Sequence, residues 1–214
     1  MNQQKSLASL LKARLEEWSA SAPDNIKIAY QEGLDAIKES DIVPTALKEG
    51  DNAPDFTLKN ATGGETSLYK KLEEGPVVLT WYRGGWCPYC NITLRYLQQA
   101  LPDFKAKGAN LIALTPELPD NSLSTVEKHQ LDFEVLSDLN NSIASNYGIV
   151  FKLIPEVARL YNKAFGLDEH NGTDSHELPL AATYVIGQDK KIIYSFLDID
   201  YRNRAEPADI LAVL

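Results

Sequence analysis

The feature that most constrains this chain is a pair of cysteines at the end of an apolar, β-rich run. Residues 77–82, Val-Val-Leu-Thr-Trp-Tyr, have the composition of a short buried strand. They are followed at once by Arg-Gly-Gly-Trp-Cys-Pro-Tyr-Cys at 83–90. Apolar residues at helical spacing come next, with a kink or an end predicted at Pro102. The sequence therefore predicts that Cys87 and Cys90 lie where a central strand turns into a helix.

This position favours redox chemistry. If Cys87 is the N-cap of the helix, Pro88 occupies the first helical position, where its missing N–H and fixed φ cost nothing. The Cys87 sulfur then faces the unpaired N–H groups and the positive end of the helix dipole. Such surroundings lower a cysteine pKa from about 8.5 to between roughly 3.5 and 7.5. We expect Cys87 to be the attacking thiolate and Cys90, one turn further in, to be the more buried resolving residue.

Three other interpretations of the pair stay open. A structural disulfide across so short a loop would constrain the unfolded chain by only about 2 kcal/mol. A structural zinc ion needs four ligands, so two would have to come from His129, His170 and His176. Two inert core thiols would leave the placement of the pair at a strand-to-helix turn unexplained.

Composition narrows the setting of this chemistry. The chain has 214 residues, 44% of them hydrophobic, and a formal net charge of −9. This size predicts one compact domain with extensions, and the acidic balance disfavours nucleic acid and anionic membrane surfaces as partners. No apolar run approaches the roughly 20 residues of a membrane-spanning helix, and charged residues from Lys12 to Glu17 interrupt any signal-like stretch. We expect a cytosolic protein, where structural disulfides are rare.

The chain divides into a helical beginning and a mixed remainder. An apolar stripe from Leu7 to Trp18 predicts one amphipathic helix, and Asp24 is a candidate cap for a second. We assign residues 1–42 to an N-terminal helical extension, which packs on the main domain or on the partner in a homodimer. From residue 43 onward, predicted strands alternate with helices and close in a hairpin, which indicates an α/β sheet with helices on both faces. The predicted strands are 77–82, 109–115, 133–136, 183–186 and 192–197, and the predicted helices are 122–130, 141–147, 155–165 and one from about 206.

Three stretches resemble a known family: GDNAPDFTL at 50–58, VVLTWYRGGWCPYC at 77–90 and LPLAATYVIGQDKKIIYSF at 178–196. They are similar to the alkyl hydroperoxide reductase and thiol-specific antioxidant family, and most to its peroxiredoxin-like branch that carries CxxC. The resemblance covers residues 43–214. It implies a thioredoxin-like fold, with a central mixed sheet and helices on both faces. It also implies cytosolic reduction of peroxides by a thiol, with electrons from a thioredoxin-like donor. We expect no cofactor and no metal.

The sequence departs from the family pattern around the cysteines. Typical peroxiredoxins have Pro-x3-Thr-x2-Cys, whereas Thr80 and Gly84 occupy the Pro and Thr positions before Cys87. The family's arginine before the last core strand has no counterpart in residues 180–183, and the cis-proline of thioredoxins is replaced by Ala181-Ala182. A thiol–disulfide oxidoreductase of thioredoxin type and a non-enzymatic binding module therefore stay open beside the peroxidase.

A peroxidase needs groups besides the two cysteines, because thiolate formation alone accounts for only about 2 kcal/mol of a barrier reduction of at least about 8 kcal/mol. We expect Arg83 to polarise the O–O bond, with Arg202 or Arg204 reaching in from the tail as an alternative. The Gly84 and Gly85 amides are candidate peroxide-binding donors. Trp86 and Trp81 are expected to exclude water.

Overall fold

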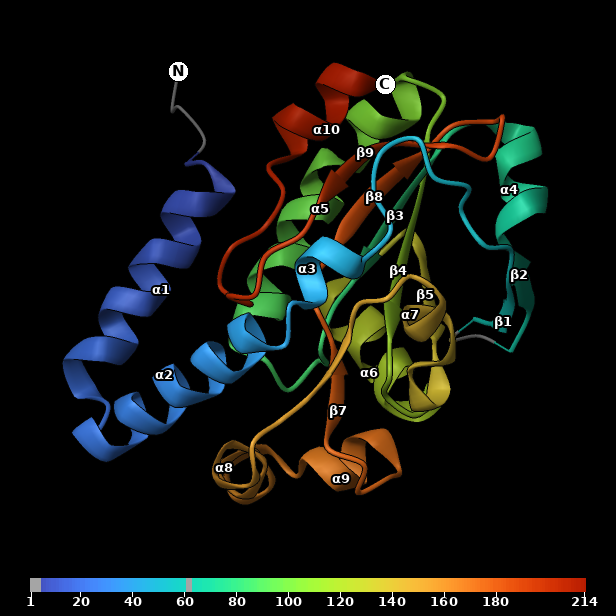
Figure 1. Ribbon diagram of the computed structural model, residues 1–214. Coiled ribbons are helices and arrows are strands. Elements are labelled where there is room, and N and C mark those ends of the chain that lie inside the picture. Colours follow the sequence, from blue (N-terminus) through green and yellow to red (C-terminus); the bar gives the residue numbers. More distant parts are fainter. Residues whose placement is uncertain (1–4, 61–62) are drawn as a thin grey trace.

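The computed structural model describes residues 5–60 and 63–214 and has a five-stranded sheet at its centre (Figure 1). The strand order is β5-β4-β3-β8-β9. β3 (Val77–Trp81), β4 (Asn110–Thr115) and β5 (Glu134–Ser137) run parallel. β8 (Thr183–Ile186) runs antiparallel to β3 and forms the hairpin with β9 (Ile192–Phe196). The sheet is therefore mixed, with the strand before the cysteine pair in its middle, as predicted.

Helices cover both faces of this sheet, which is the architecture of a thioredoxin-like fold. Side chains alternate along β3, so that Leu79 faces one core cluster and Val78 faces the other. The Val78 side is packed by α1 (Leu7–Ser21), α5 (Pro88–Ala106) and α10 (Pro207–Val213). The Leu79 side is packed by α2 (Asp24–Glu39), α4 (Leu68–Glu74), α7 (Ser142–Asn146) and α8 (Pro155–Phe165).

Shorter elements complete the fold. Two small antiparallel pairs, β1–β2 and β6–β7, lie outside the central sheet. The sequence did not predict α4 or the β6–β7 pair, because their three to seven residues are too few for a periodic pattern. The remaining elements are α3 (Ile42–Thr45), β1 (Thr57–Lys59), β2 (Glu65–Ser67), α6 (Pro119–His129), η1 (Leu139–Asn141), β6 (Val150–Lys152), α9 (Leu167–Asn171) and β7 (Glu177–Pro179).

α5 is longer than expected, because it continues through Pro102 to Ala106. A proline inside a helix forfeits one backbone hydrogen bond. Leu101 and Phe104, on either side of it, are buried in the core, so apolar packing holds the last turn in place.

The two N-terminal helices pack on this chain's own core. Leu7 and Leu11 of α1 are buried against α5, and the Glu206 carboxylate accepts hydrogen bonds from the backbone N–H groups of Leu7 and Ala8. α2 begins after Pro23, so Asp24 lies in its first turn and is not its cap. None of the helices among residues 5–60 and 63–214 has both the length and the apolar character that crossing a bilayer demands.

We expect the substitution Leu11→Ala to lower the free energy of unfolding by about 2–4 kcal/mol, because it removes buried methyl groups and leaves a cavity between α1 and α5. Lys12→Ala is the matched control, since the Lys12 side chain is 76% exposed, and its effect should be below about 0.5 kcal/mol. Denaturant unfolding measures both. Equal effects would show that α1 does not stabilise the domain.

Candidate functional site

The cysteine pair lies at the start of α5, directly after β3. Cys87 is the N-cap, with extended backbone angles, and Pro88 is the first helical residue. The Cys87 N–H donates to the Gly84 carbonyl over 3.1 Å. No side chain caps the helix, so its first N–H groups are directed toward the Cys87 position. The predicted strand–turn–helix placement is confirmed.

Hydrogen bonds to both the N–H and the carbonyl of Gly85 hold the turn before Cys87. The Gly85 N–H donates to Oε2 of the fully buried Glu117 over 2.8 Å, and its carbonyl accepts from Nδ2 of Asn91 over 2.9 Å. The other Glu117 oxygen lies 2.8 Å from Nδ1 of His170, a hydrogen bond that raises the His170 pKa. A Cβ at Gly85 would lie only 2.1 Å from Oγ1 of Thr125. The turn is therefore rigid and needs glycine here.

Of the two candidate peroxide-binding amides, that of Gly85 is occupied, and the role of the Gly84 amide stays a prediction. The Gly85 amide is already bonded to Glu117, so it is not free for a substrate. A Cβ at Gly84 would meet Nε1 of Trp86 at 2.1 Å, and its φ of +153° also favours glycine. The two glycines shape the turn, and neither lines the pocket at Cys87.

Arg83 is a buried cation in an aromatic setting. It is 3% exposed, and its Nη1 donates to the Tyr161 hydroxyl over 3.2 Å. Its guanidinium carbon lies 3.8 Å from the ring centre of Tyr201 and 5.0 Å from that of Trp86, which are cation–π distances. Nε of Arg83 has no hydrogen-bond partner. Among the described residues, no carboxylate forms an ion pair with Arg83, so a donor is left beside the cysteines.

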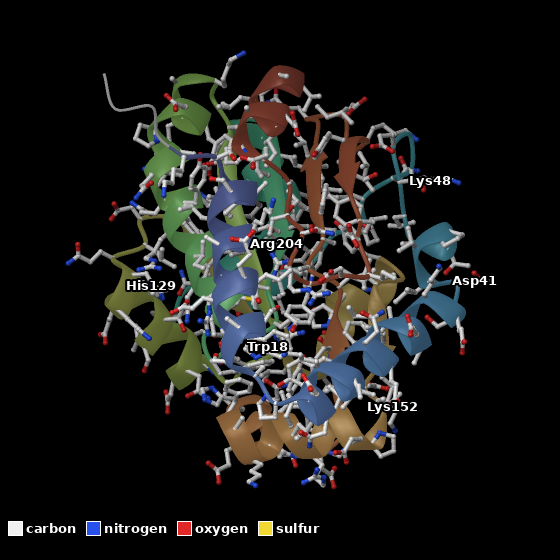
Figure 2. All side chains as sticks on the ribbon, turned by 90° about the vertical axis from the view of Figure 1, so that its left-hand side faces the viewer. Trp18, Asp41, Lys48, His129, Lys152 and Arg204 are labelled. Atoms are coloured by element: carbon white, nitrogen blue, oxygen red, sulfur yellow. The ribbon has the colours of Figure 1, made fainter. Side chains whose placement is uncertain are left out.

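A second arginine comes from the C-terminal tail. Nη2 of Arg204 lies 3.6 Å from Sγ of Cys90, and its Nη1 donates to the backbone carbonyls of Tyr201 and Asn203. Figure 2 shows Arg204 behind α1, on the inner side of that helix. Arg202, the other candidate, binds Asp200 instead. Of the two tail arginines that the sequence offered, Arg204 is therefore the one that contacts the pair.

The negative charge of the reduced pair is centred on Cys90. Both cysteines are free thiols and fully buried. Burial and a hydrogen bond to Cys90 raise the Cys87 pKa, so the prediction of a lowered pKa at Cys87 is wrong for this arrangement. The Cys90 pKa is lowered to about 5, against the cost of burial, by the Cys87 thiol that donates to it and by Arg204 and Arg83. The pair thus shares one proton, held by Cys87.

Cys87 nevertheless has the better access. It lines a pocket of about 100 Å³ whose walls are mainly aromatic. Two of the rings, Trp18 and Tyr30, come from the N-terminal helices, which the sequence predicted only as packing elements. The other lining residues are Arg14, Arg83, Trp86, Pro88, Tyr89, Tyr161, Phe165 and Tyr201. Cys90 is 0% exposed and is absent from this lining. Trp86 lines the pocket, so its predicted role at the site stays a prediction, whereas Trp81 packs in the core against Tyr147 and Tyr184 and does not line the pocket.

The histidines considered as zinc ligands are engaged elsewhere. His170 pairs with Glu117, His176 lies 3.4 Å from Asp168, and His129 contacts Asn91 over 3.0 Å. Within the described part of the chain, no three residues of the types His, Cys, Asp and Glu are grouped to hold a metal ion.

A buried cysteine pair at the start of a helix, after the central strand of a thioredoxin-like sheet, defines a thiol-dependent oxidoreductase. The AhpC/TSA family matches residues 49–195, which is more than half of the chain. The protein belongs to this family. The family match begins after the N-terminal helices, and the domain boundary at residues 42/43 stays a prediction.

Named relatives fall into two groups. The chain is 25% identical over 173 residues to chloroplastic peroxiredoxin Q of Populus jackii, covering 73% of this chain and 81% of that protein. It is 28% identical over 105 residues to the thiol-disulfide oxidoreductase ResA of Bacillus thuringiensis subsp. konkukian, covering 49% and 60%. Among solved structures, peroxidoxin BcpB from Mycobacterium tuberculosis matches with a TM-score of 0.62 at 22% identity, covering 78% and 96%, which supports the fold.

Ultraviolet thiolate absorbance of the reduced protein should titrate with an apparent pKa of about 5, a property of the coupled pair. Arg204→Gln should raise it by at least about one unit, because it removes the cation beside Cys90. Arg204→Lys should restore much of the shift, and Arg202→Gln is the control. Because the folded pKa lies below the value of 9.0 for a free thiol, the thiolate's stabilising effect is complete above about pH 9 and is lost as the pH falls through 5. An unchanged pKa in Arg204→Gln would contradict this assignment.

Proposed function

We propose that this protein is a thiol-dependent peroxidase in which Cys87 attacks the peroxide and Cys90 forms a disulfide with it. The observation that carries the proposal is the position of Cys87 in a small aromatic pocket, where the residue is only 1% exposed. A peroxide can enter a space of about 100 Å³, whereas a disulfide on the surface of another protein cannot reach the sulfur in this arrangement.

The reaction starts from the reduced pair with one thiol and one thiolate. Cys90 first accepts the proton of Cys87, and the Cys87 thiolate attacks the terminal peroxide oxygen. The O–O bond breaks, Cys87 becomes a sulfenic acid, and the leaving alkoxide takes the proton from Cys90. The Cys90 thiolate then attacks the Cys87 sulfur and displaces hydroxide, which leaves a disulfide, an alcohol and a hydroxide ion. The two thiols lose two electrons, and the peroxide gains them.

Arg83 supplies the donor that this chemistry needs. Its buried Nε has no partner, and Arg83 lines the same pocket as Cys87. A charged donor in a dry site stabilises negative charge on the leaving oxygen far better than water does. Arg204 has a separate role, because its contact with Cys90 stabilises the charge of the resting pair. In this proposal, Arg83 and Arg204 take over the roles of the family's usual threonine and arginine, which the sequence lacks.

The electron donor in this proposal is a thioredoxin-like dithiol protein in a reducing compartment such as the cytosol. Family membership supports a donor of this kind. The homodimer stays a prediction, since the apolar stripes of α1 and α2 pack within this chain.

A thiol–disulfide oxidoreductase without peroxidase activity is the second candidate. The likeness to ResA favours it, as does a CxxC pair at the start of a helix. Reduction of insulin disulfides tests this candidate directly. If the protein reduces insulin disulfides faster than it reduces peroxide, the result would favour the oxidoreductase over the peroxidase.

Mixing reduced protein with micromolar hydroperoxide should give a fast change in tryptophan fluorescence, because Trp86 adjoins Cys87. Cys87→Ser should abolish the change. Cys90→Ser should let a sulfenic acid accumulate at Cys87 and over-oxidise, as seen by dimedone labelling and mass spectrometry. Arg83→Met should slow the oxidation by about 10²–10³-fold. A rate no faster than that of a small thiol of similar pKa would exclude the peroxidase.

A further inference from the structure

The N-terminal helices do more than cover the core, because their aromatic side chains close the pocket over Cys87. Trp18, near the end of α1, stacks on Tyr30 of α2 with ring centres 5.5 Å apart and planes 3° from parallel. Tyr30 in turn meets the edge of Tyr161, 5.4 Å away, which packs against Trp86. Figure 2 shows α1 in front of the sheet and α5, with Trp18 at its lower end. The α1–α2 hairpin, residues 7–39, therefore forms the outer wall of the site.

The pocket is small as well as aromatic. Its volume of about 100 Å³ is below the roughly 150 Å³ of an apolar cavity that accepts benzene. A branched group of about four carbons fits such a space, whereas a phenyl-bearing group requires the walls to move apart.

We propose that Trp18 and Tyr30 determine specificity, and that they restrict the substrate to hydroperoxides with a small, branched apolar group. This inference rests on the proposed peroxidase function. It names the substrate class and adds to the site two residues that lie outside the matched residues 49–195. The hydroperoxide's polar end is directed to the Cys87 sulfur and to the unpartnered Nε of Arg83. Its apolar end contacts the Trp18 and Tyr30 rings. Hydrogen peroxide has no apolar group and does not contact these rings.

The experiment compares kcat/KM for hydrogen peroxide, tert-butyl hydroperoxide and cumene hydroperoxide. In the natural protein, kcat/KM for tert-butyl hydroperoxide should exceed kcat/KM for cumene hydroperoxide by at least about 10-fold. The reason is that a substrate group too large for an apolar pocket by even one methylene lowers kcat/KM by about 10–200-fold. Trp18→Ala enlarges the pocket and should raise the ratio of cumene to tert-butyl hydroperoxide by about 10-fold. Tyr30→Ala should act in the same direction.

Two further variants serve as controls. Ile28→Ala lies on the same helix as Tyr30, but Ile28 is 58% exposed and outside the pocket, so all three rates should be unchanged. Trp18→Phe keeps an aromatic wall and should retain most of the natural preference. If Trp18→Ala lowers all three rates in equal proportion, or if the natural protein reduces cumene hydroperoxide as well as tert-butyl hydroperoxide, the inference is wrong.

A binding measurement separates this inference from the peroxidase proposal. Saturation-transfer NMR with the product alcohols, tert-butyl alcohol and cumyl alcohol, needs no turnover. Binding of tert-butyl alcohol alone by the natural protein, and of cumyl alcohol also by Trp18→Ala, supports the size limit even if no peroxide is reduced. Absence of tert-butyl alcohol binding overturns the inference, whatever the peroxidase activity.

Discussion

The site depends on two buried guanidinium groups that are compensated by a thiolate and aromatic rings. An ion in a protein interior costs several kcal/mol unless other groups compensate its charge. Arg83 and Arg204 form no ion pair with a described carboxylate, and the shared negative charge of Cys87 and Cys90 lies beside both of them. Formation of a disulfide would remove that charge and leave the two cations compensated only by aromatic rings and uncharged oxygen acceptors. The arrangement therefore stabilises the reduced, charged pair relative to the disulfide.

This charge balance requires that the nearby buried carboxylate be held elsewhere. Glu117 is fully buried, but one of its oxygens accepts from the Gly85 N–H and the other meets His170. Its charge therefore orders the turn and is not directed to the arginines. Asn91 binds the opposite side of Gly85, so the turn is fixed from α5 as well. Glu117 thus fixes the conformation of the turn and, because it is engaged there, does not compensate the charges of the two arginines. The cysteine pair does so instead.

Local rules were enough to predict the centre of the fold. The run at 77–82 alternates between two buried faces, and Pro88 marks the first position of a helix, so strand, turn and cap follow from neighbouring residues. The sulfur that holds the charge could not be predicted in this way, because Arg204 is 114 residues from Cys90. The apolar stripe from Leu7 to Trp18 predicted a buried helix face. The position of Trp18 at the Cys87 pocket could not be predicted, because it depends on how α2 packs against α8, a tertiary contact without a local sequence signal.

The burial of the cysteine pair, which suits a small peroxide, also affects the step in which a donor protein reduces the disulfide. A protein dithiol must bring its own sulfur to within bonding distance of Cys87 or Cys90, yet both are buried, and Cys90 more deeply. Unwinding the first turn of α5 would break the packing of Tyr89 and Cys90 in the core. Lifting the end of the α1–α2 hairpin would keep the Trp18–Tyr30 stack, which lies within the hairpin. It would break the Tyr30–Tyr161 ring contact and the packing of that end of α2 against α8, while Leu7 and Leu11 could stay anchored at the far end of α1. Because ring pairs contribute about 0.5–1.5 kcal/mol each beyond their buried area, the hairpin is the less costly route by which a protein donor could reach the pair.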